Sequence, residues 1–385
     1  MPVAYLLGIS MALHLYVGGR LIPHLPGALA AVLMAMLLTC SALFMPLGLF
    51  ARRIARPPVT DTLAWIGLLF MGLFSSLLVG TVMRDALLLL VWLAGLAAPD
   101  LLPAKAIRET TAEAVPLLAF ALTALGLLNA RRTARVVTVD LPIAALPPAL
   151  QAFRIVQISD IHVGPTIKQR YLEGIVEAVN RLKPDLVAIT GDLVDGSVDE
   201  LGRHVAPLTR LVSRHGSFFV TGNHEYYSGA DPWIRELQRL GIEVLLNRHV
   251  VIEHGGARLV LAGVPDYSAH HYDATHQIDP VAALAGAPAD AAVRVLLAHQ
   301  PRGVDVAARA GFHVQLSGHT HGGQFLPWTY LVPLQQPFTA GLHRVANLWL
   351  YVSRGTGYWG PPKRLGAPSE ITELRLVAAT DFTVP

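Results

Sequence analysis

The chain has 385 residues, of which 53% are hydrophobic and 15% are charged. Because a soluble domain usually carries about 25% charged residues, a disordered protein and an ordinary soluble globular protein both fit the whole chain poorly. The charge is also unevenly divided: residues 1–136 hold ten Lys/Arg and five Asp/Glu, whereas residues 137–385 hold twenty and twenty-two. The basic excess therefore belongs to the more apolar part of the chain, and we expect no nucleic-acid partner.

Four runs without charged residues predict membrane-spanning helices in the first third of the chain. They cover residues 3–19, 27–51, 62–83 and 114–130. The middle two reach the roughly 20 residues that a helix needs to cross the hydrocarbon layer. A fifth run, 86–99, is consistent with a short span, an interfacial segment or an extension of the third helix. We expect residues 1–136 to form an all-α transmembrane region that contacts the lipid bilayer.

The basic residues between these runs predict an orientation, because cytoplasmic loops carry an excess of Lys and Arg. With four spans, six arginines share one side of the membrane and four basic residues share the other. The two groups are Arg52, Arg53, Arg56, Arg131, Arg132 and Arg135 against Arg20, Arg84, Lys105 and Arg108. The larger group predicts a cytoplasmic C-terminal half, whereas five spans would divide the residues evenly.

Short apolar runs alternate with amphipathic segments after the Pro-containing stretch 142–148. Strands are predicted at residues 153–158, 185–190, 217–221, 243–246, 257–262, 293–298, 314–317, 347–353 and 371–377. Helices are predicted at 167–182, 200–213, 232–240 and 302–310. This alternation is typical of an α/β domain with buried sheets, which we expect over residues 150–380.

Polar side chains follow five of the predicted strands at the point where each strand ends. They are Asp160 and His162, Asp192 and Asp195, Asn223 with His224 and Glu225, His299, and finally His319 with His321. In α/β sheets, ligands bind at the carboxyl ends of the strands. Side chains spread over the sequence are therefore expected to converge on one site there.

The cluster of two Asp, one Asn and four His has the ligand chemistry of a metal site. Carboxylate and imidazole ligands suit divalent Mn, Fe or Zn, and the chain's one cysteine, Cys40, excludes a thiolate site. Seven ligands are too many for one catalytic ion but suit two ions about 3.5–4 Å apart with a bridging carboxylate. Such a pair predicts hydrolysis of a phosphate ester or anhydride.

Five motifs follow one another within residues 150–380: Asp-x-His, Gly-Asp-x-x-Asp, Gly-Asn-His-Glu, His and Gly-His-x-His. Their order resembles that of the calcineurin-like metallophosphoesterase superfamily. Segments 318–324 and 353–357 resemble its bacterial membrane-anchored branch, which implies a multi-pass protein of the cell inner membrane. Segment 366–370 (Gly-Ala-Pro-Ser-Glu) departs from that branch, which puts the shape of the pocket wall in doubt. The resemblance implies a two-sheet sandwich flanked by helices.

The resemblance also implies a role for each site residue by position. One metal would be held by Asp160, His162 and His321, the other by Asn223, His299 and His319, with Asp192 as the bridge. His224 would donate a proton to the leaving group or stabilise the transition state, and Asp195 would orient His224. The alternative interpretations are a helix cap for Asp195 and a solvated neighbour of the site for Glu225.

The function expected from these features is hydrolysis of a phosphodiester or pyrophosphate bond by a metal-bridging hydroxide. Tethering to a membrane favours a lipid-linked or nucleotide-linked substrate, as in relatives that cleave the pyrophosphate of a UDP-diacylated glucosamine. The alternatives are a broad phosphomonoesterase or nucleotide phosphodiesterase, and an inactive metal-binding scaffold. The oligomeric state is left open.

Three further groups of residues have both a functional and a structural interpretation. The apolar residues 325–333 and 358–359 predict either a rim that admits an acyl chain or ordinary core packing. Arg354, Lys363 and Arg364 are consistent with phosphate contacts or with solvated charge. The histidines in loop 266–291 (His270, His271 and His276) are interpreted as solvated, against a role in gating the substrate.

Overall fold

The computed structural model describes residues 3–54, 56, 58–98 and 102–379. The chain divides into two compact units by the packing of its backbone. The helical unit comprises the residues up to Arg131 together with Gly360–Leu365. The α/β unit comprises Arg132–Trp359 together with the residues from Gly366 onward, so it begins before residue 150.

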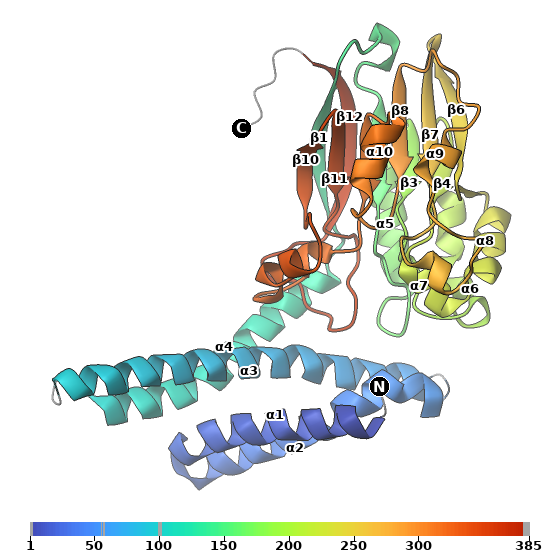
Figure 1. Ribbon diagram of the computed structural model, residues 1–385. Helices are drawn as coiled ribbons and strands as arrows, with labels where there is room; N and C mark the ends of the chain where they lie inside the picture. The colour runs from blue at the N-terminus through green and yellow to red at the C-terminus, as the bar shows by residue number, and fades with distance from the viewer. Residues whose placement is uncertain (1–2, 55, 57, 99–101, 380–385) are drawn as a thin grey trace. The chain divides into compact units, whose positions relative to one another are not determined.

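Four long helices dominate the helical unit (Figure 1). They are α1 (Val3–Leu21), α2 (Gly27–Ile54), α3 (Val59–Ala97) and α4 (Ala104–Arg131). Within the described residues, these four are long and apolar enough to cross a membrane. Their apolar side chains share a common core that includes Val17, Leu38, Leu77 and Ala119.

Helix α3 continues through the apolar run 86–97, past the charged pair Arg84–Asp85. The guanidinium of Arg84 donates to Oγ1 of Thr111 (3.2 Å) and to the carbonyl oxygen of Arg108 (3.0 Å), both on α4. Asp85 accepts a hydrogen bond from Nε of Arg20 on α1 at 2.9 Å. Because both charged side chains have partners within the bundle, they do not end the helix.

The segment Gly360–Leu365 packs with α3 and α4, although it is far from them in the sequence. The Nζ atom of Lys363 donates to the carbonyl oxygen of Gly72 at 3.0 Å. The amide of Arg364 donates to the carbonyl oxygen of Gly126 at 2.9 Å. Both side chains are 1% exposed, so the interpretation of these two residues as solvated charges is wrong.

Two six-stranded mixed sheets form the α/β unit. The first has the order β1-β12-β2-β3-β4-β5 and the second β10-β11-β9-β8-β7-β6. The strands of the first sheet are β1 (Arg135–Ile143), β12 (Glu370–Ala378), β2 (Arg154–Ile158), β3 (Leu186–Ile189), β4 (Ser217–Phe219) and β5 (Glu243–Val244). Those of the second are β10 (Gly341–Val345), β11 (Leu348–Val352), β9 (Val314–Ser317), β8 (Val293–Leu297), β7 (Ala257–Gly263) and β6 (Arg248–His254).

Strands β2 to β5 run parallel in the first sheet, and β7, β8, β9 and β11 run parallel in the second. The carboxyl ends of β2, β3 and β4 therefore share one edge, and those of β8 and β9 share another. Buried residues of both sheets, including Ile155, Phe218, Leu261 and Leu316, form one core between them. This packing aligns the two sheets face to face.

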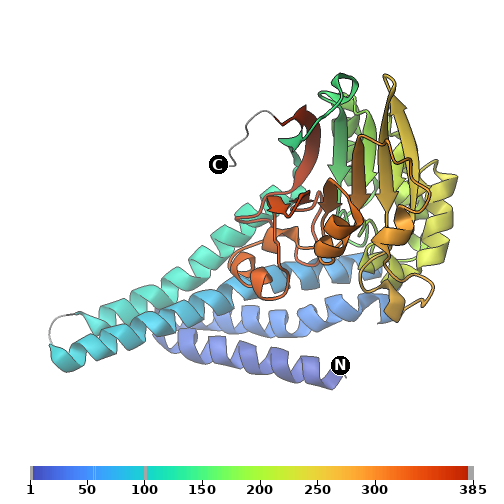
Figure 2. The ribbon, with the colours of Figure 1, turned by 45° about the horizontal axis from the view of Figure 1, so that its top comes forward.

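Helices flank the sheets. They are α5 (Gln169–Arg181), α6 (Val198–Val205), α7 (Asn223–Ser228), α8 (Ala230–Arg239), α9 (Pro280–Ala283) and α10 (Val304–Ala310). Figures 1 and 2 show α9 and α10 against the second sheet, where Ala283, Val304 and Ala307 pack with Ala262 and Leu350. The predicted sandwich of two sheets flanked by helices, preceded by a region of apolar helices, is confirmed.

Candidate metal centre

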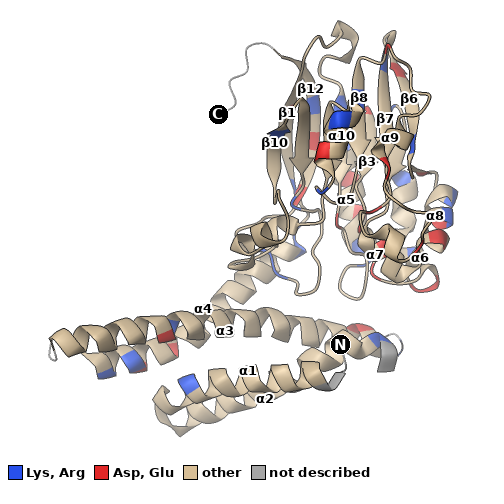
Figure 3. Cartoon of the chain, viewed as in Figure 1, with Lys and Arg blue, Asp and Glu red and all other residues tan. Residues whose placement is uncertain are grey.

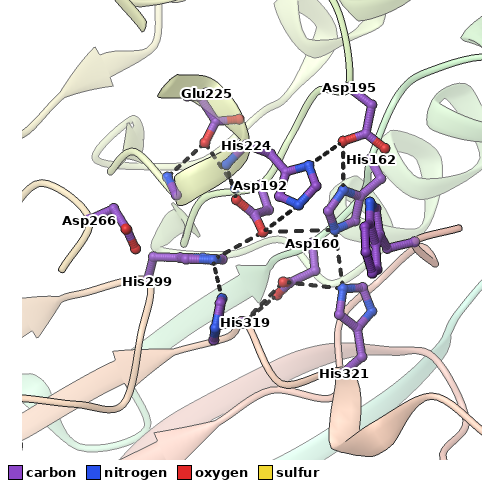
Figure 4. Close-up of polar contacts among 12 residues, drawn as sticks. Asp160, His162, Asp192, Asp195, His224, Glu225, Asp266, His299, His319 and His321 are labelled. Atoms are coloured by element: carbon purple, nitrogen blue, oxygen red, sulfur yellow. Dashed lines mark hydrogen bonds and ion pairs between the residues drawn. The ribbon is translucent and has the colours of Figure 1, made fainter. Parts of the chain in front are cut away.

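The polar side chains at the ends of five strands converge on one site (Figure 4). They follow β2, β3, β4, β8 and β9, as the sequence predicts. Five of the seven predicted ligands have a left-handed backbone: Asp160 (φ 53°), His162 (56°), Asp192 (51°), His319 (71°) and His321 (52°). Such conformations are uncommon for residues other than glycine and gather at functional sites. The backbone therefore turns sharply where each side chain enters the site.

The first group of possible metal ligands consists of Asp160, His162 and His321. The Nε2 atoms of His162 and His321 lie 3.1 Å apart, and Nε2 of His321 lies 3.5 Å from Oδ1 of Asp160. Two imidazole nitrogens at this separation require a proton or a cation between them. The group is buried, which favours a shared ion.

The second group consists of Asp192, His299 and His319. Nε2 of His299 lies 3.1 Å from Oδ2 of Asp192 and 3.2 Å from Nδ1 of His319. The same Oδ2 atom lies 3.9 Å from Nε2 of His162, which belongs to the first group. Asp192 therefore lies between the two groups of ligands.

Asn223 supplies a further donor at the start of α7. Its Oδ1 atom is buried and, within the described part of the chain, has no hydrogen-bond partner. A buried oxygen without a hydrogen-bond partner lowers the stability of the folded protein by about 1–3 kcal/mol, unless a bound cation or another group contacts it. The donor set of carboxylate, amide and imidazole groups fits two divalent cations.

Neighbouring groups orient the possible ligands. Nδ1 of His299 lies 2.8 Å from the carbonyl oxygen of Thr190, which leaves Nε2 to face the site. Asp160 accepts hydrogen bonds from the Ser159 hydroxyl (2.6 Å) and from the amide of His319 (3.0 Å). Such contacts hold metal ligands in place before the ion binds.

Asp195 links two histidines at the edge of the site. Its Oδ1 atom lies 2.6 Å from Nδ1 of His224 and 3.0 Å from Nδ1 of His162. Helix α6 begins at Val198 with Ser197 as its N-cap, so the helix-cap interpretation of Asp195 is wrong.

The charges around His224 change its proton affinity. Burial disfavours the charged imidazole, but Asp192 and Asp195 outweigh it and raise the pKa of His224 to about 9. Burial acts against the charge of Asp195 as well, yet His162 and His224 hold the pKa of its carboxyl below the usual range. At neutral pH His224 is therefore protonated, beside an ionised Asp195.

Comparison with known proteins agrees with this geometry. Residues 153–323 match the profile of the calcineurin-like phosphoesterase family. A bovine protein named "Transmembrane protein with metallophosphoesterase domain" is 42% identical over 309 residues, which cover 77% of this chain and 69% of that relative. The chain belongs to the calcineurin-like metallophosphoesterase family. It is a metal-dependent phosphoesterase, and its family uses two metal ions.

Two further matches are more distant. An uncharacterized metallophosphoesterase of Helicobacter pylori is 39% identical over 227 residues, which cover 58% of this chain and 60% of that relative. The crystal structure of a 5'-nucleotidase precursor from Thermus thermophilus matches 59% of this chain and 54% of its own, with 17% identity and a TM-score of 0.37.

Glu225 of the metallophosphoesterase site is fully buried, so its interpretation as a solvated neighbour is wrong. Its carboxylate accepts hydrogen bonds from the amides of Gly222 (2.7 Å), Asp192 (3.0 Å), Leu193 (2.8 Å) and Val194 (3.3 Å). One side chain thus holds together the loops that follow β3 and β4. The available sequence signal is a Glu three residues after Gly222, the N-cap of α7, because a Glu at this position can accept a hydrogen bond from the N-cap amide.

Asp266 is a second buried acid that the sequence analysis missed. It lies beside His299 (Figure 4) and accepts hydrogen bonds from Nε2 of Gln300 (3.0 Å) and from the amide of Ser268 (2.8 Å). These contacts connect the loop that follows β7 with the residues that follow β8. A lone Asp in a polar loop carries no sequence signal for such a role.

Gly191 allows the loops after β3 and β4 to approach each other closely. Its φ of +85° lies in the left-handed region, and a Cβ atom there would lie 2.6 Å from the amide nitrogen of Gly222. The same Cβ would lie 2.8 Å from Nδ1 of His299. A side chain at this position would therefore displace two parts of the site.

Some of the residues for which the sequence allows both a functional and a structural interpretation lie in the core, and others lie at the surface. Phe325 and Tyr358 are buried, whereas Leu326, Trp328, Tyr330 and Leu331 are exposed, as is Trp359. Arg354 forms an ion pair with Glu370, with 2.9 Å between Nη1 and Oε2. His270 and His271 are exposed, and Nδ1 of His276 lies 2.9 Å from the Tyr226 hydroxyl.

Proposed function

We propose that this chain is a membrane-anchored dinuclear hydrolase that cleaves a phosphodiester or pyrophosphate bond. The observation that carries the proposal is the position of Asp192, whose Oδ2 atom lies 3.1 Å from Nε2 of His299 in its own group of possible ligands and 3.9 Å from Nε2 of His162 in the other group. Asp160, His162 and His321 would hold one ion; Asn223, His299 and His319 would hold the other, with Asp192 bridging both. The unpartnered Oδ1 of Asn223 supports its place in this set.

When bound, two divalent ions of Mn, Fe or Zn supply positive charge to polarise a phosphoryl oxygen and a hydroxide nucleophile near neutral pH. The ligand atoms meet at the carboxyl ends of the strands, so the reacting phosphate would lie there.

His224 would donate the proton that the leaving oxygen needs. Its Nδ1 is bound to Asp195, so Nε2 faces Asp192, with 4.0 Å between Nε2 and Oδ2. In the metal-free protein, Asp192 and Asp195 raise the pKa of this imidazole to about 9, and a protonated imidazole suits a general acid. Asp195 would hold the tautomer and the ring orientation.

Aromatic rings beside His224 support a nucleotide-linked leaving group. The ring centroids of Tyr227 and Trp359 lie 5.1 Å and 5.6 Å from that of His224. Tyr272 continues the row, with its ring 5.5 Å from that of Tyr227. All three rings are more than half exposed, so they are placed to stack against a planar group of the substrate.

Exposed apolar residues after His321 support a lipid-linked substrate. Leu326, Trp328, Tyr330 and Leu331 each leave more than 40% of their surface exposed. Trp and Tyr favour the interface of a bilayer, and the four apolar helices would keep the enzyme there. The arginine asymmetry supports a catalytic unit in the cytoplasm and helices in the inner membrane.

The test is a comparison of three substrates with the full chain in detergent and added Mn²⁺. Because an enzyme discriminates between substrates by the ratio of their kcat/KM values, kcat/KM is the quantity to compare. We expect it to be at least about tenfold higher for a chromogenic bis-ester and for a lipid pyrophosphate than for a monoester. The variant Asp192→Ala is the negative control and should be inactive. Faster monoester hydrolysis would favour the phosphomonoesterase, and no hydrolysis despite bound metal would favour the scaffold.

A further inference from the structure

Three arginines of the helical unit line a cavity that the phosphoesterase chemistry does not use. The cavity has a volume of about 450 Å³, and Arg20, His24, Arg84 and Arg108 form its polar wall. Leu88 and Trp92 of α3 belong to its apolar wall. The helices carry few charged residues over most of their length (Figure 3), so this grouping of basic side chains stands apart.

Among the described residues, the positive charge around the cavity exceeds the negative charge. Asp85 is the described acid bound to these arginines: its two carboxylate oxygens share the Nε–H of Arg20, each at 2.9 Å, and Oδ1 lies 3.7 Å from Nη1 of Arg84. The Tyr16 hydroxyl also donates to Asp85 at 2.7 Å. One carboxylate is therefore shared between two guanidinium groups.

The other charges that the structure describes nearby do not compensate the third arginine. Lys105 and Glu109 pair with each other at 3.9 Å, which leaves Arg108 without that carboxylate. The Arg84 side chain is 1% exposed, and a buried charge is costly unless an opposite charge accompanies it. Within the described part of the chain, two positive charges are in excess beside an apolar wall, and they fit a ligand that carries both an anion and a hydrocarbon part.

The length of α3 allows this cavity to lie near the level of lipid headgroups. A helix of 39 residues extends about 58 Å at ~1.5 Å per residue, whereas the hydrocarbon layer is about 30 Å thick. Part of α3 must therefore extend beyond that layer or tilt strongly. Trp92, about two helical turns after Arg84, is 59% exposed, as expected for a side chain at the membrane interface.

We propose that this cavity binds the phosphate of an anionic phospholipid, with Arg20, Arg84 and Arg108 as the recognising groups. Leu88 and Trp92 contact the glycerol and the first part of the acyl chains. The same phosphate chemistry could come from a soluble phosphate compound, and the experiment separates the two sources. The site is independent of the metal centre and of the proposed hydrolysis.

The experiment is native mass spectrometry of the full chain in detergent, titrated with phosphatidylglycerol. We compare the wild type with the double variant Arg20→Gln/Arg108→Gln, because Arg84 also joins α3 to α4 and its removal endangers folding. The control is Arg52→Gln/Arg56→Gln, which removes the same charge from exposed positions outside the cavity. Thermal unfolding of all three proteins checks that each is folded.

We expect one phosphatidylglycerol to bind the wild type, and the cavity variant to bind it roughly 30-fold more weakly. The control variant should stay within about threefold of the wild type, since surface charges contribute little at a distance. Competition by millimolar inorganic phosphate would identify a soluble phosphate as the ligand, and its absence would identify the lipid. Two results would overturn the proposal. One is an equal loss of phosphatidylglycerol affinity in the cavity variant and the control variant; the other is binding of zwitterionic phosphatidylcholine as tight as that of phosphatidylglycerol.

Discussion

The Nδ1 atom of His224 lies 2.6 Å from Oδ1 of Asp195. This contact joins a histidine that follows β4 to a carboxylate that follows β3, and it turns Nε2 of His224 toward Asp192. The pair connects the proposed metal ligands with the place where a leaving group would depart. Several consequences of this arrangement are measurable.

Replacing His224 by Asn should lower kcat by roughly 10²- to 10⁴-fold for a diester whose leaving group needs a proton. The loss should be much smaller for a p-nitrophenolate leaving group, which departs without one. Metal content should stay that of the wild type, because His224 is not among the proposed ligands. Steady-state kinetics on the two esters checks this, and equal losses on both would exclude proton donation.

The stability of the metal-free protein should depend on pH through His224. Its folded pKa of about 9 lies above the ordinary value of 6.5. The stabilisation is therefore fully present below about pH 6.5 and is lost as the pH rises through about 9, with a maximum of about 3 kcal/mol.

Asp195→Asn removes one of the charges that raise this pKa, so the chelated variant should lose less stability between pH 6.5 and 9. Thermal unfolding of the chelated wild type and variant at several pH values measures the difference. The same pH dependence in both proteins would contradict the role assigned to Asp195.

Replacing Glu225 by Gln should destabilise the protein and weaken metal binding. The amide has one acceptor oxygen where the carboxylate has two, so some of the four amides that now donate to Glu225 would lose their partner. The expected loss is about 2 kcal/mol of unfolding free energy. Denaturant titration and metal titration measure it, and unchanged metal affinity would show that Glu225 does not position Asp192.

Gln324 should act on substrate binding through Trp359. Its side-chain amide donates to the carbonyl oxygen of Trp359 and accepts from the amide of Trp359, both at 2.8 Å. Trp359→Ala should raise KM for a substrate with an aromatic leaving group by roughly 5- to 100-fold, and Gln324→Ala by less.

Trp359→Phe keeps an aromatic ring and should restore most of the binding, while kcat stays near the wild-type value in both Trp359 variants. If KM is the same in Trp359→Ala and the wild type, the ring does not contact the leaving group. A fall in kcat alone would instead indicate a structural defect of the loop.

The central strands could be predicted from the sequence, as could β5 at one edge of the first sheet, but the other three edge strands could not. Strands β1, β6 and β10 were missed, and each lies at an edge of its sheet. Their residues are mostly exposed or half-buried, so they lack the continuous apolar runs of β2, β3 and β8. The first turns of α4 were missed for a similar reason, because Lys105, Arg108 and Glu109 are charged and the apolar run that predicted this helix begins only after them.

The residues at the strand ends could be predicted because Asp160, Asp192 and His299 each follow an apolar run directly. The structure brings them together, and their roles as metal ligands stay predictions. The burial of Glu225 and the contact between Gln324 and Trp359 could not be predicted. Both depend on loops that meet only in the folded chain, and a polar side chain is usually solvated.

The metal content of the purified full chain tests the central claim most directly. Elemental analysis should find close to two divalent ions per wild-type chain and a strongly reduced content in Asp192→Ala, together with loss of turnover. A wild type without stoichiometric metal, or an Asp192→Ala variant that keeps both ions and its activity, would contradict the dinuclear centre.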